Sequence, residues 1–355
     1  MTHIAAKGIR AEFWAPTGQL DGFVVSDGGR EIAPLHRAPW VDTDEVLPPG
    51  SPPHMARLGG DFFCAPFAGR EDGSALHGWP ANAPWTVTGT TSDTLEARLS
   101  RRVQGATLTK TLHLQDDHPF VYQTHRFSGG SGSISVANHA NVSVQDGALI
   151  RTSPKRHWET PVDPQESDPA RGRSLLVYPA QISNPATFPA QTGSVDLTTY
   201  PWGQGYEDFV VAIEAEGSAL GWTAVTRPVQ GDLFVSLRNA LTLPMTMLWH
   251  SNGGRDYAPW SARHVGCLGV EEGAAAHMLG VSTEADLFAP GFLALAPDKE
   301  VTVRHVIGAI AWPTGDGVAS VRLHGTRLVI TAEGGASRTI PFDAAFLGLP
   351  PGVST

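Results

Sequence analysis

Short runs that alternate between apolar and polar residues recur along the whole chain, with turn-forming residues between them. Clear examples are 108–114, 134–144 and 301–307. Because successive side chains of a β-strand point to opposite faces of its sheet, this period of two predicts half-buried strands. The 39 glycines and 28 prolines punctuate the runs, and helical patterns are confined to short segments near 283–288 and 343–347. The sequence therefore predicts an all-β protein with large, mainly antiparallel sheets packed face to face.

One continuous domain, residues 1–355, is the simplest organisation, because no fixed repeat or low-complexity tract divides the chain. Residues 316–355 are expected to add edge strands to it. The segment 153–173 is rich in proline and charge and lacks periodicity. It is interpreted either as the lid or rim of a functional site or as a solvated insertion.

The balance of charge limits the partners of this chain. It has 35 acidic and 25 basic side chains, a formal charge of −10, and no run of Lys or Arg. Nucleic acid and anionic membranes are therefore not expected to bind. No apolar run reaches the roughly 20 residues of a membrane span, and the first residues lack the pattern of a signal peptide. We expect a cytoplasmic protein whose partner is neutral, or is an anion held by a few local arginines.

Metal-binding motifs are absent from the sequence. Cys64 and Cys267 are too few for a disulfide framework or a four-cysteine zinc site, and no H-x-H or H-E-x-x-H pair occurs. Both cysteines are interpreted as small buried thiols. The sequence therefore predicts neither a metal nor another cofactor.

Alternation places one histidine and one carboxylate away from the core. In 134–144 the even-numbered apolar residues point to the core, so His139 lies on the opposite, more polar face. On this pattern alone, His139 is either a site residue or a solvent-facing strand residue. In 265–273 the same argument selects Glu271 for the face away from the core, and Glu272 is expected at the rim or at the start of a turn.

Two neighbouring segments combine glycine, proline and aromatic residues with single polar groups. They span 59–70, which ends in Arg70, and 76–85, which contains His77. Sugar sites are often built in this way, because aromatic faces pack on C–H surfaces while polar groups bind hydroxyls. A pair of β-turns with ordinary core aromatic residues is the alternative.

In their order along the chain, several segments resemble motifs of the galactose mutarotase-like superfamily, the aldose 1-epimerases and their relatives. These segments are Pro66-Phe-Ala-Gly-Arg70, His77-Gly78 with Trp85, Asn138-His139-Ala-Asn141, Gly205-Tyr-Glu-Asp-Phe-Val210 and Gly266-Cys-Leu-Gly-Val-Glu271. The resemblance implies a β-supersandwich, a monosaccharide substrate, and interconversion of its α and β anomers without a cofactor.

The resemblance also implies roles for individual residues. His139 would be the general acid and Glu271 the general base, facing each other about a pyranose ring apart. With ordinary pKa values of about 4.3 and 6.5, such a Glu is ionised and such a His is partly protonated at neutral pH. Arg70 and His77 would hold sugar oxygens.

A further sugar-binding carboxylate is expected from the segment 205–210, at either Glu207 or Asp208. Alternation favours Asp208, because Glu207 should point inward together with Phe209 and Val211.

Three other functions remain open from the sequence. An epimerase of a phosphorylated or acidic sugar would use Arg70, Arg255 and Arg263 as cationic contacts. A non-catalytic carbohydrate-binding protein would keep the fold without turnover. A lyase or hydrolase on a related sandwich is disfavoured, because neither a secretion signal nor a second catalytic domain is evident.

Overall fold

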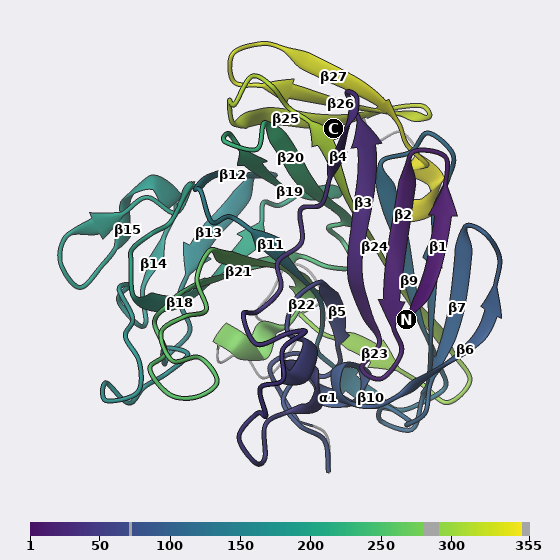
Figure 1. Ribbon diagram of the computed structural model, residues 1–355, viewed down its shortest axis with the longest axis horizontal. Coiled ribbons are helices and arrows are strands. Elements are labelled where there is room, and N and C mark those ends of the chain that lie inside the picture. The colour runs from purple at the N-terminus through teal and green to yellow at the C-terminus, as the bar shows by residue number, and fades with distance from the viewer. Residues whose placement is uncertain (71–72, 280–290, 350–355) are drawn as a thin grey trace.

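The computed structural model describes residues 1–70, 73–279 and 291–349, and within them two large antiparallel sheets dominate (Figure 1). The larger sheet has eleven strands, in the order β1-β2-β3-β5-β11-β22-β21-β18-β13-β14 with β4 paired to β3. Its strands are β1 (Thr2–Ala6), β2 (Ile9–Trp14), β3 (Gln19–Asp27), β4 (Arg30–Ile32), β5 (Asp61–Cys64), β11 (Val136–Ser143), β13 (Lys155–Glu159), β14 (Gln181–Ile182), β18 (Tyr206–Glu214), β21 (Met245–Asn252) and β22 (Cys267–Ala274).

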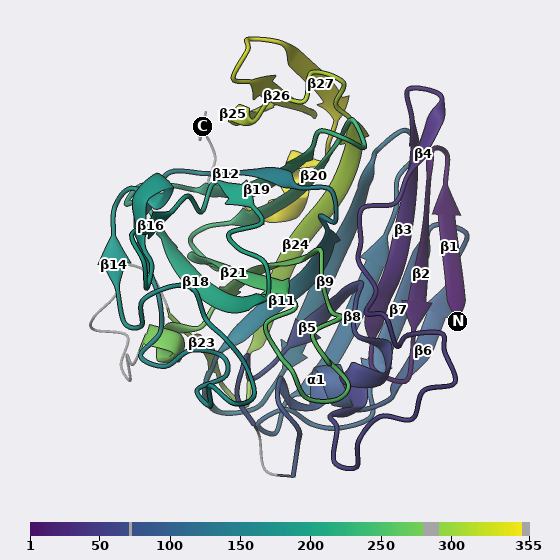
Figure 2. The same ribbon diagram turned by 60° about the vertical axis from the view of Figure 1, so that its left-hand side comes forward.

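The second sheet has nine strands, in the order β17-β12-β19-β20-β24-β9-β8-β7-β6 (Figure 2). Its strands are β6 (Trp85–Thr90), β7 (Thr94–Leu99), β8 (Thr107–His113), β9 (Phe120–Ser128), β12 (Ala148–Thr152), β17 (Thr199–Tyr200), β19 (Leu220–Arg227), β20 (Asp232–Asn239) and β24 (Glu300–Ala311). The all-β prediction is confirmed.

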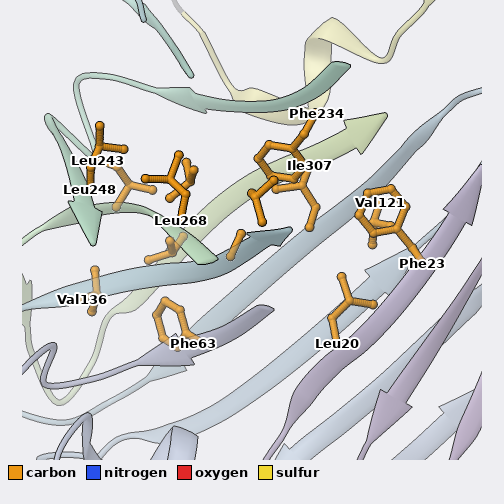
Figure 3. Close-up of a cluster of buried hydrophobic side chains, with 14 of the residues drawn as sticks. Leu20, Phe23, Phe63, Val121, Val136, Phe234, Leu243, Leu248, Leu268 and Ile307 are labelled. Carbon is orange, nitrogen blue, oxygen red and sulfur yellow. The ribbon is translucent and has the colours of Figure 1, made fainter. Parts of the chain in front are cut away.

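The main core lies between these two sheets and is built by the alternation seen in the sequence (Figure 3). From the eleven-stranded sheet it takes residues such as Phe23, Val136 and Leu268, and from the nine-stranded sheet Val121 and Ile307. Each strand turns every second side chain into this layer. The other side chains of both sheets face outward and need a second cover.

Residues 318–341 supply that cover for the nine-stranded sheet. They form a separate three-stranded sheet of β25 (Val318–His324), β26 (Arg327–Ala332) and β27 (Ser337–Pro341). Its buried residues, Leu328 among them, pack with Trp222 and Val235 on the outer face of the large sheet. The expected edge strands are thus a separate layer, because alternation reveals a strand's faces but not its pairing partner. Residues 350–355 lie outside the described residues.

Short elements complete the chain. The predicted turn of helix near 343–347 is present as η5 (Ala344–Leu347), whereas 283–288 lies outside the described residues. The others are α1 (Gly78–Asn82), η1 (Pro53–Arg57), η2 (Pro185–Thr187), η3 (Ala276–Leu279), β10 (Gly132–Ile134), β23 (Leu293–Leu295), β15 (Phe188–Pro189) and β16 (Ser194–Val195). Across residues 1–70, 73–279 and 291–349, no helix has the length and apolar character needed to cross a membrane.

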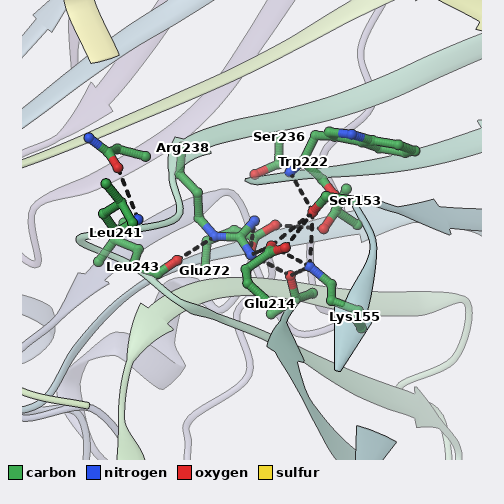
Figure 4. Close-up of polar contacts among 12 residues, drawn as sticks. Ser153, Lys155, Glu214, Trp222, Ser236, Arg238, Leu241, Leu243 and Glu272 are labelled. Carbon is green, nitrogen blue, oxygen red and sulfur yellow. Dashed lines mark hydrogen bonds and ion pairs between the residues drawn. The ribbon is translucent and has the colours of Figure 1, made fainter. Parts of the chain in front are cut away.

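A buried ionic network lies between the two large sheets (Figure 4). Arg238 of β20 is fully buried and pairs with Glu214 and with Glu272, the latter at 2.6 Å. Lys155 shares the Glu214 carboxylate, and Thr223 donates a hydrogen bond of 2.6 Å to Glu272. The expectation that Glu272 lies at a rim or turn is therefore wrong. Glu272 shares the core-facing side of β22 with Leu268 and Val270, as alternation indicates. Its buried partner Arg238 lies on the opposite sheet, and alternation within one strand cannot predict such a partner.

Candidate functional site

A cleft of about 850 Å³ lies on the outer face of the eleven-stranded sheet. Its floor takes side chains from five strands that are neighbours in that sheet, β5, β11, β22, β21 and β18. These side chains belong to Phe62, His139, Glu271, Phe209 and Trp249, and the indole of Trp249 also forms part of one wall. The rim comes from segments between residues 48 and 58, 161 and 171, and 255 and 260.

His139 and Glu271 are in direct contact on this floor. The two residues are opposite each other in the antiparallel pair of β11 and β22. Nε2 of His139 lies 3.1 Å from Oε1 of Glu271, and the two side chains are only 5% and 2% exposed. They are closer than the expected width of a pyranose ring, because directly opposed residues of neighbouring strands share one face with adjacent Cβ atoms.

Neighbouring residues fix the position of this pair. The ring of Phe62 stacks on His139 with centroids 4.4 Å apart, and the carboxylate of Asp61 accepts a hydrogen bond of 3.0 Å from the His139 backbone N–H. A Cβ atom at Gly269 would lie 2.8 Å from Oε1 of Glu271. The glycine therefore makes the room that the Glu271 carboxyl group occupies.

Burial sets the charge state of the pair. It raises the pKa of Glu271 well above its usual value. Burial, and to a smaller extent the charge of His54, lowers the pKa of His139 to about 3. Both shifts favour uncharged forms, so the pair carries one proton, with the Glu271 carboxylic acid donating to the neutral His139 ring. Glu271 was expected to be ionised and His139 partly protonated, whereas burial favours the uncharged form of both side chains.

Two further histidines line one wall of the cleft. Asn82 donates through its amide nitrogen to two backbone carbonyls, so its oxygen faces Nδ1 of His54 at 2.9 Å and accepts that N–H. The backbone N–H of Ala68 donates to Nδ1 of His77 at 3.3 Å. Neutral His54 therefore presents an Nε2 lone pair and neutral His77 presents an Nε2–H group. Burial lowers the pKa of His54 to about 4 and that of His77 well below its usual value.

Glu207 supports the opposite, aromatic wall from behind. Its carboxylate accepts hydrogen bonds from Nε1 of Trp249 at 2.6 Å and from the Ser251 hydroxyl at 2.9 Å. Arg255 approaches the same carboxylate at 3.4 Å and lies over the ring of Trp260, 4.4 Å from its centroid. Burial raises the pKa of Glu207, and the charge of Arg255 opposes that rise. Aromatic surface and an arginine thus face the histidines across the cleft.

Comparison with known proteins used both sequence and structure. No family model and no curated protein sequence matches the chain. Among solved structures, a candidate aldose 1-epimerase from Escherichia coli K12 is 14% identical with a TM-score of 0.57, and the match covers 86% of this chain and 97% of that one. The chain has the galactose mutarotase-like fold.

Two other structures with the galactose mutarotase-like fold are similar to the chain. A galactose mutarotase-like protein from Lactobacillus casei is 12% identical, with a TM-score of 0.54 and coverage of 87% of this chain and 99% of that one. A galactose mutarotase related enzyme from Lactobacillus acidophilus is 11% identical, with a TM-score of 0.52 and coverage of 87% and 96%. The β-supersandwich prediction is thereby confirmed, although the sequence identity to these structures is low.

The expectation that Asp208 contacts the sugar needs correction. Asp208 is on the sandwich side of β18, where its carboxylate accepts hydrogen bonds from the backbone of Leu175 and Leu176 and from the Tyr178 hydroxyl. It does not line the cleft. Glu207, the alternative, points with Phe209 into the outer layer that contains the cleft, but it lies behind Trp249 and does not line the cleft either.

The other predicted binding residues divide between the cleft and the surface. His77 lines the cleft, whereas Arg70 is exposed and is not among the lining residues. Of the arginines considered for an anion, Arg255 lines the cleft, but Arg263 pairs with Glu45 outside it. The segment 153–173 contributes β13 to the large sheet and then supplies part of the cleft rim.

Several cleft residues were not singled out from the sequence, among them Trp249, Phe209 and His54. β21 and almost all of β18 are buried on both faces, so the apolar–polar alternation that marks a half-buried strand is weak there. His54 lies in the irregular segment around η1, where no periodic signal exists. Their only signal is three-dimensional, since they surround His139 and Glu271.

Proposed function

We propose that the protein is an aldose 1-epimerase that interconverts the α and β anomers of a free monosaccharide without a cofactor. The observation that carries this proposal is the contact of 3.1 Å between Nε2 of His139 and Oε1 of Glu271 at the floor of the cleft. Mutarotation needs one group that takes a proton and one that gives a proton. A buried histidine and carboxyl group sharing one proton meet that need.

The geometry of the pair suits the two sugar atoms involved. The anomeric hydroxyl and the ring oxygen are bonded to one carbon, so they lie side by side as the His139 nitrogen and Glu271 oxygen do. With the proton on His139, Glu271 removes the proton of the anomeric hydroxyl while His139 protonates the ring oxygen. The bond between the anomeric carbon and the ring oxygen then breaks.

The open-chain aldehyde rotates about its first carbon–carbon bond, and the reverse transfers close the ring to either anomer. In the opening step His139 loses one proton to the ring oxygen and Glu271 gains one from the anomeric hydroxyl. Ring closure reverses both transfers, so the pair ends with the number of protons with which it began. Burial by itself favours the neutral arrangement of the pair. Polar sugar groups would stabilise the ionised arrangement, in which Glu271 is the base and His139 the acid.

The walls of the cleft are suited to a pyranose. Trp249 and Trp260 offer aromatic faces for its C–H surfaces. His54 and His77 offer one acceptor and one donor for hydroxyls. None of these four side chains requires a charge on the sugar.

An acidic or phosphorylated sugar is the second candidate, because Arg171 and Arg255 both line the cleft. The Nε atom of Arg255 is buried and has no hydrogen-bond partner among the described residues. Arg171 lies over the Tyr257 ring, 3.9 Å from its centroid. One guanidinium group deep in the cleft and one at its rim would suit an anionic substituent.

The test is anomer exchange measured by NMR saturation transfer with neutral, acidic and phosphorylated aldoses. Acceleration proportional to protein concentration supports the proposal, and the preferred class separates the two candidates. Replacing Arg255 with Gln should lower kcat/KM for an anionic sugar more than for a neutral one. Sugar binding by calorimetry without acceleration would instead indicate a non-catalytic carbohydrate-binding protein.

A further inference from the structure

A second group of functional side chains lies behind the aromatic wall of the cleft. It consists of His36, from the segment after β4, His264, from the segment before β22, and Cys267, the first residue of β22. One ligand atom from each residue lies within 4.8 Å of the other two. His264 and Cys267 are 1% and 0% exposed. None of the three lines the cleft.

The ring nitrogens of this group are the strongest indication of a ligand. Nε2 of His36 and Nε2 of His264 are both buried and have no hydrogen-bond partner among the described residues. Buried polar atoms are nearly always paired. The two rings meet edge to face with centroids 4.9 Å apart, so the two unpaired nitrogens belong to adjacent rings. An occupant that accepts lone pairs from both would remove both deficits.

The hydrogen bonds of His264 prepare its free nitrogen to be a ligand. Nδ1 lies 2.7 Å from the Ser251 hydroxyl, which donates in turn to the Glu207 carboxylate at 2.9 Å. Because the serine proton is directed to Glu207, Nδ1 of His264 carries a proton and donates it to Ser251. Its Nε2 atom then holds a lone pair. Metal-binding histidines characteristically donate their second N–H to a polar partner in this way.

We propose that His36, His264 and Cys267 bind a divalent cation that prefers nitrogen and thiolate ligands, with Zn²⁺ as the favoured ion. Imidazole nitrogen and thiolate sulfur are both ligands of Zn²⁺, and three protein ligands leave the fourth position of the tetrahedron to water or another small ligand. Binding replaces the thiol proton of Cys267, which is released to solvent. The ring of Trp249 stacks on His264 with centroids 5.5 Å apart and faces the cleft. An ion bound here ties the segments that carry His36 and His264 to the start of β22, behind that wall.

This set departs from the sequence expectation of no metal. His264 and Cys267 have the spacing H-x-x-C, a short signal, but the third ligand lies far away in the sequence at His36. Only the paired strands and the loops around them bring the three together. The inference does not depend on the proposed epimerase activity, because its experiments measure metal binding and thermal stability and not the conversion of a sugar.

The test uses the full chain, stripped with a chelator and titrated with Co²⁺ as a spectroscopic probe of the Zn²⁺ site. The expected result is uptake of one Co²⁺ per chain, with a near-ultraviolet thiolate-to-cobalt band that Zn²⁺ abolishes. Cys267→Ala should remove that band and weaken Co²⁺ binding at least about 100-fold. Cys64→Ala, which removes the other buried free thiol, should leave both unchanged. Ser251→Ala should weaken binding about 10–100-fold.

Two outcomes would overturn the proposal. One is the absence of Co²⁺ uptake by the stripped wild-type chain. The other is a thiolate band that persists in Cys267→Ala. If that variant fails to fold, His36→Gln replaces it in the test, because His36 is a half-buried loop residue. Zn²⁺ should raise the Tm of the wild-type chain but not that of His36→Gln, and an equal rise in both would contradict the site.

Discussion

The indole nitrogen of Trp249 donates a hydrogen bond of 2.6 Å to the carboxylate of Glu207, and this contact holds the aromatic wall of the cleft. The same carboxylate lies 3.4 Å from Arg255. Glu207 does not itself line the cleft, so it acts by positioning two residues that do. Its neighbour Asp208 performs a different task on the other face of β18.

Glu207→Gln should weaken sugar binding more than it slows the chemical step. The neutral amide retains the shape of the side chain but loses the charge that Arg255 and the indole N–H meet. We expect KM to rise about tenfold, equivalent to about 1.4 kcal/mol, with kcat nearly unchanged. The measurement is steady-state anomer exchange across sugar concentrations.

Asp208→Asn is the matched control, because it removes a neighbouring charge without changing the cleft wall. It should lower the midpoint of urea unfolding, since Asp208 holds the segment that begins at Leu175, and leave KM unaltered. A rise in KM in Asp208→Asn, or its absence in Glu207→Gln, would contradict the assigned positions.

The rate should be insensitive to pH where an ordinary histidine titrates. The pair of His139 and Glu271 gains a second proton only near pH 3, because burial lowers the pKa of His139 to about 3. Loss of its single proton is moved to higher pH, because burial raises the pKa of Glu271 well above its usual value. We expect kcat/KM to stay flat as the pH crosses about 6.5. A fall below an apparent pKa near 6.5 would show that His139 titrates as an exposed residue does.

Stability should decrease as the pH falls below about 6.5. Burial lowers the pKa of His54 to about 4 and that of His305 to about 3 in the folded protein. Between those values and about 6.5 the unfolded chain binds protons that the folded chain does not, so the free energy of unfolding falls with the pH. Each such histidine contributes up to about 1.4 kcal/mol per pH unit.

Urea unfolding at several pH values measures this loss. His305→Gln should reduce the slope of stability against pH by the share of one proton. The same slope in the variant would show that His305 is protonated in the folded state.

The buried arginine of the ionic network should be far more important for stability than a surface arginine. Arg238→Met leaves the buried carboxylates of Glu214 and Glu272 without their shared partner and should cost about 3–5 kcal/mol. Arg126→Met removes an exposed ion pair with Glu300 and should cost about 0–1 kcal/mol. Equal shifts in the urea midpoint of the two variants would contradict the structural role of the network.

The all-β class and the strand face on which key side chains lie could be predicted from the sequence. The residues that these side chains contact could not. Alternation placed His139 and Glu271 on one type of face because a period of two is a local property of a strand. It could not place them in contact, since that follows from the pairing of β11 with β22. For the same reason it did not reveal Arg238 as the partner of Glu272, and Glu272 was expected at a rim or turn although it is buried.

Errors arose where a strand is buried on both of its faces. β18 faces the sandwich core on one side and the outer layer on the other. Alternation separates these two faces but does not show which of them lies toward the cleft, so it favoured Asp208, which lies on the sandwich side. Arg70 was assigned from a motif in a loop, and loops have no periodicity that fixes the direction of a side chain. The cleft walls and the cluster of His36, His264 and Cys267 required the three-dimensional arrangement.

The most direct test of the account is anomer exchange by saturation transfer in Glu271→Gln and His139→Ala, beside the exposed controls Glu300→Gln and His324→Ala. Each replacement in the pair removes one member of a shared-proton unit, so each should lower the exchange rate about 10²–10⁴-fold. The controls should match the wild-type chain, and all four variants should unfold cooperatively. Wild-type exchange rates in both folded Glu271→Gln and His139→Ala would contradict the proposed role of this pair.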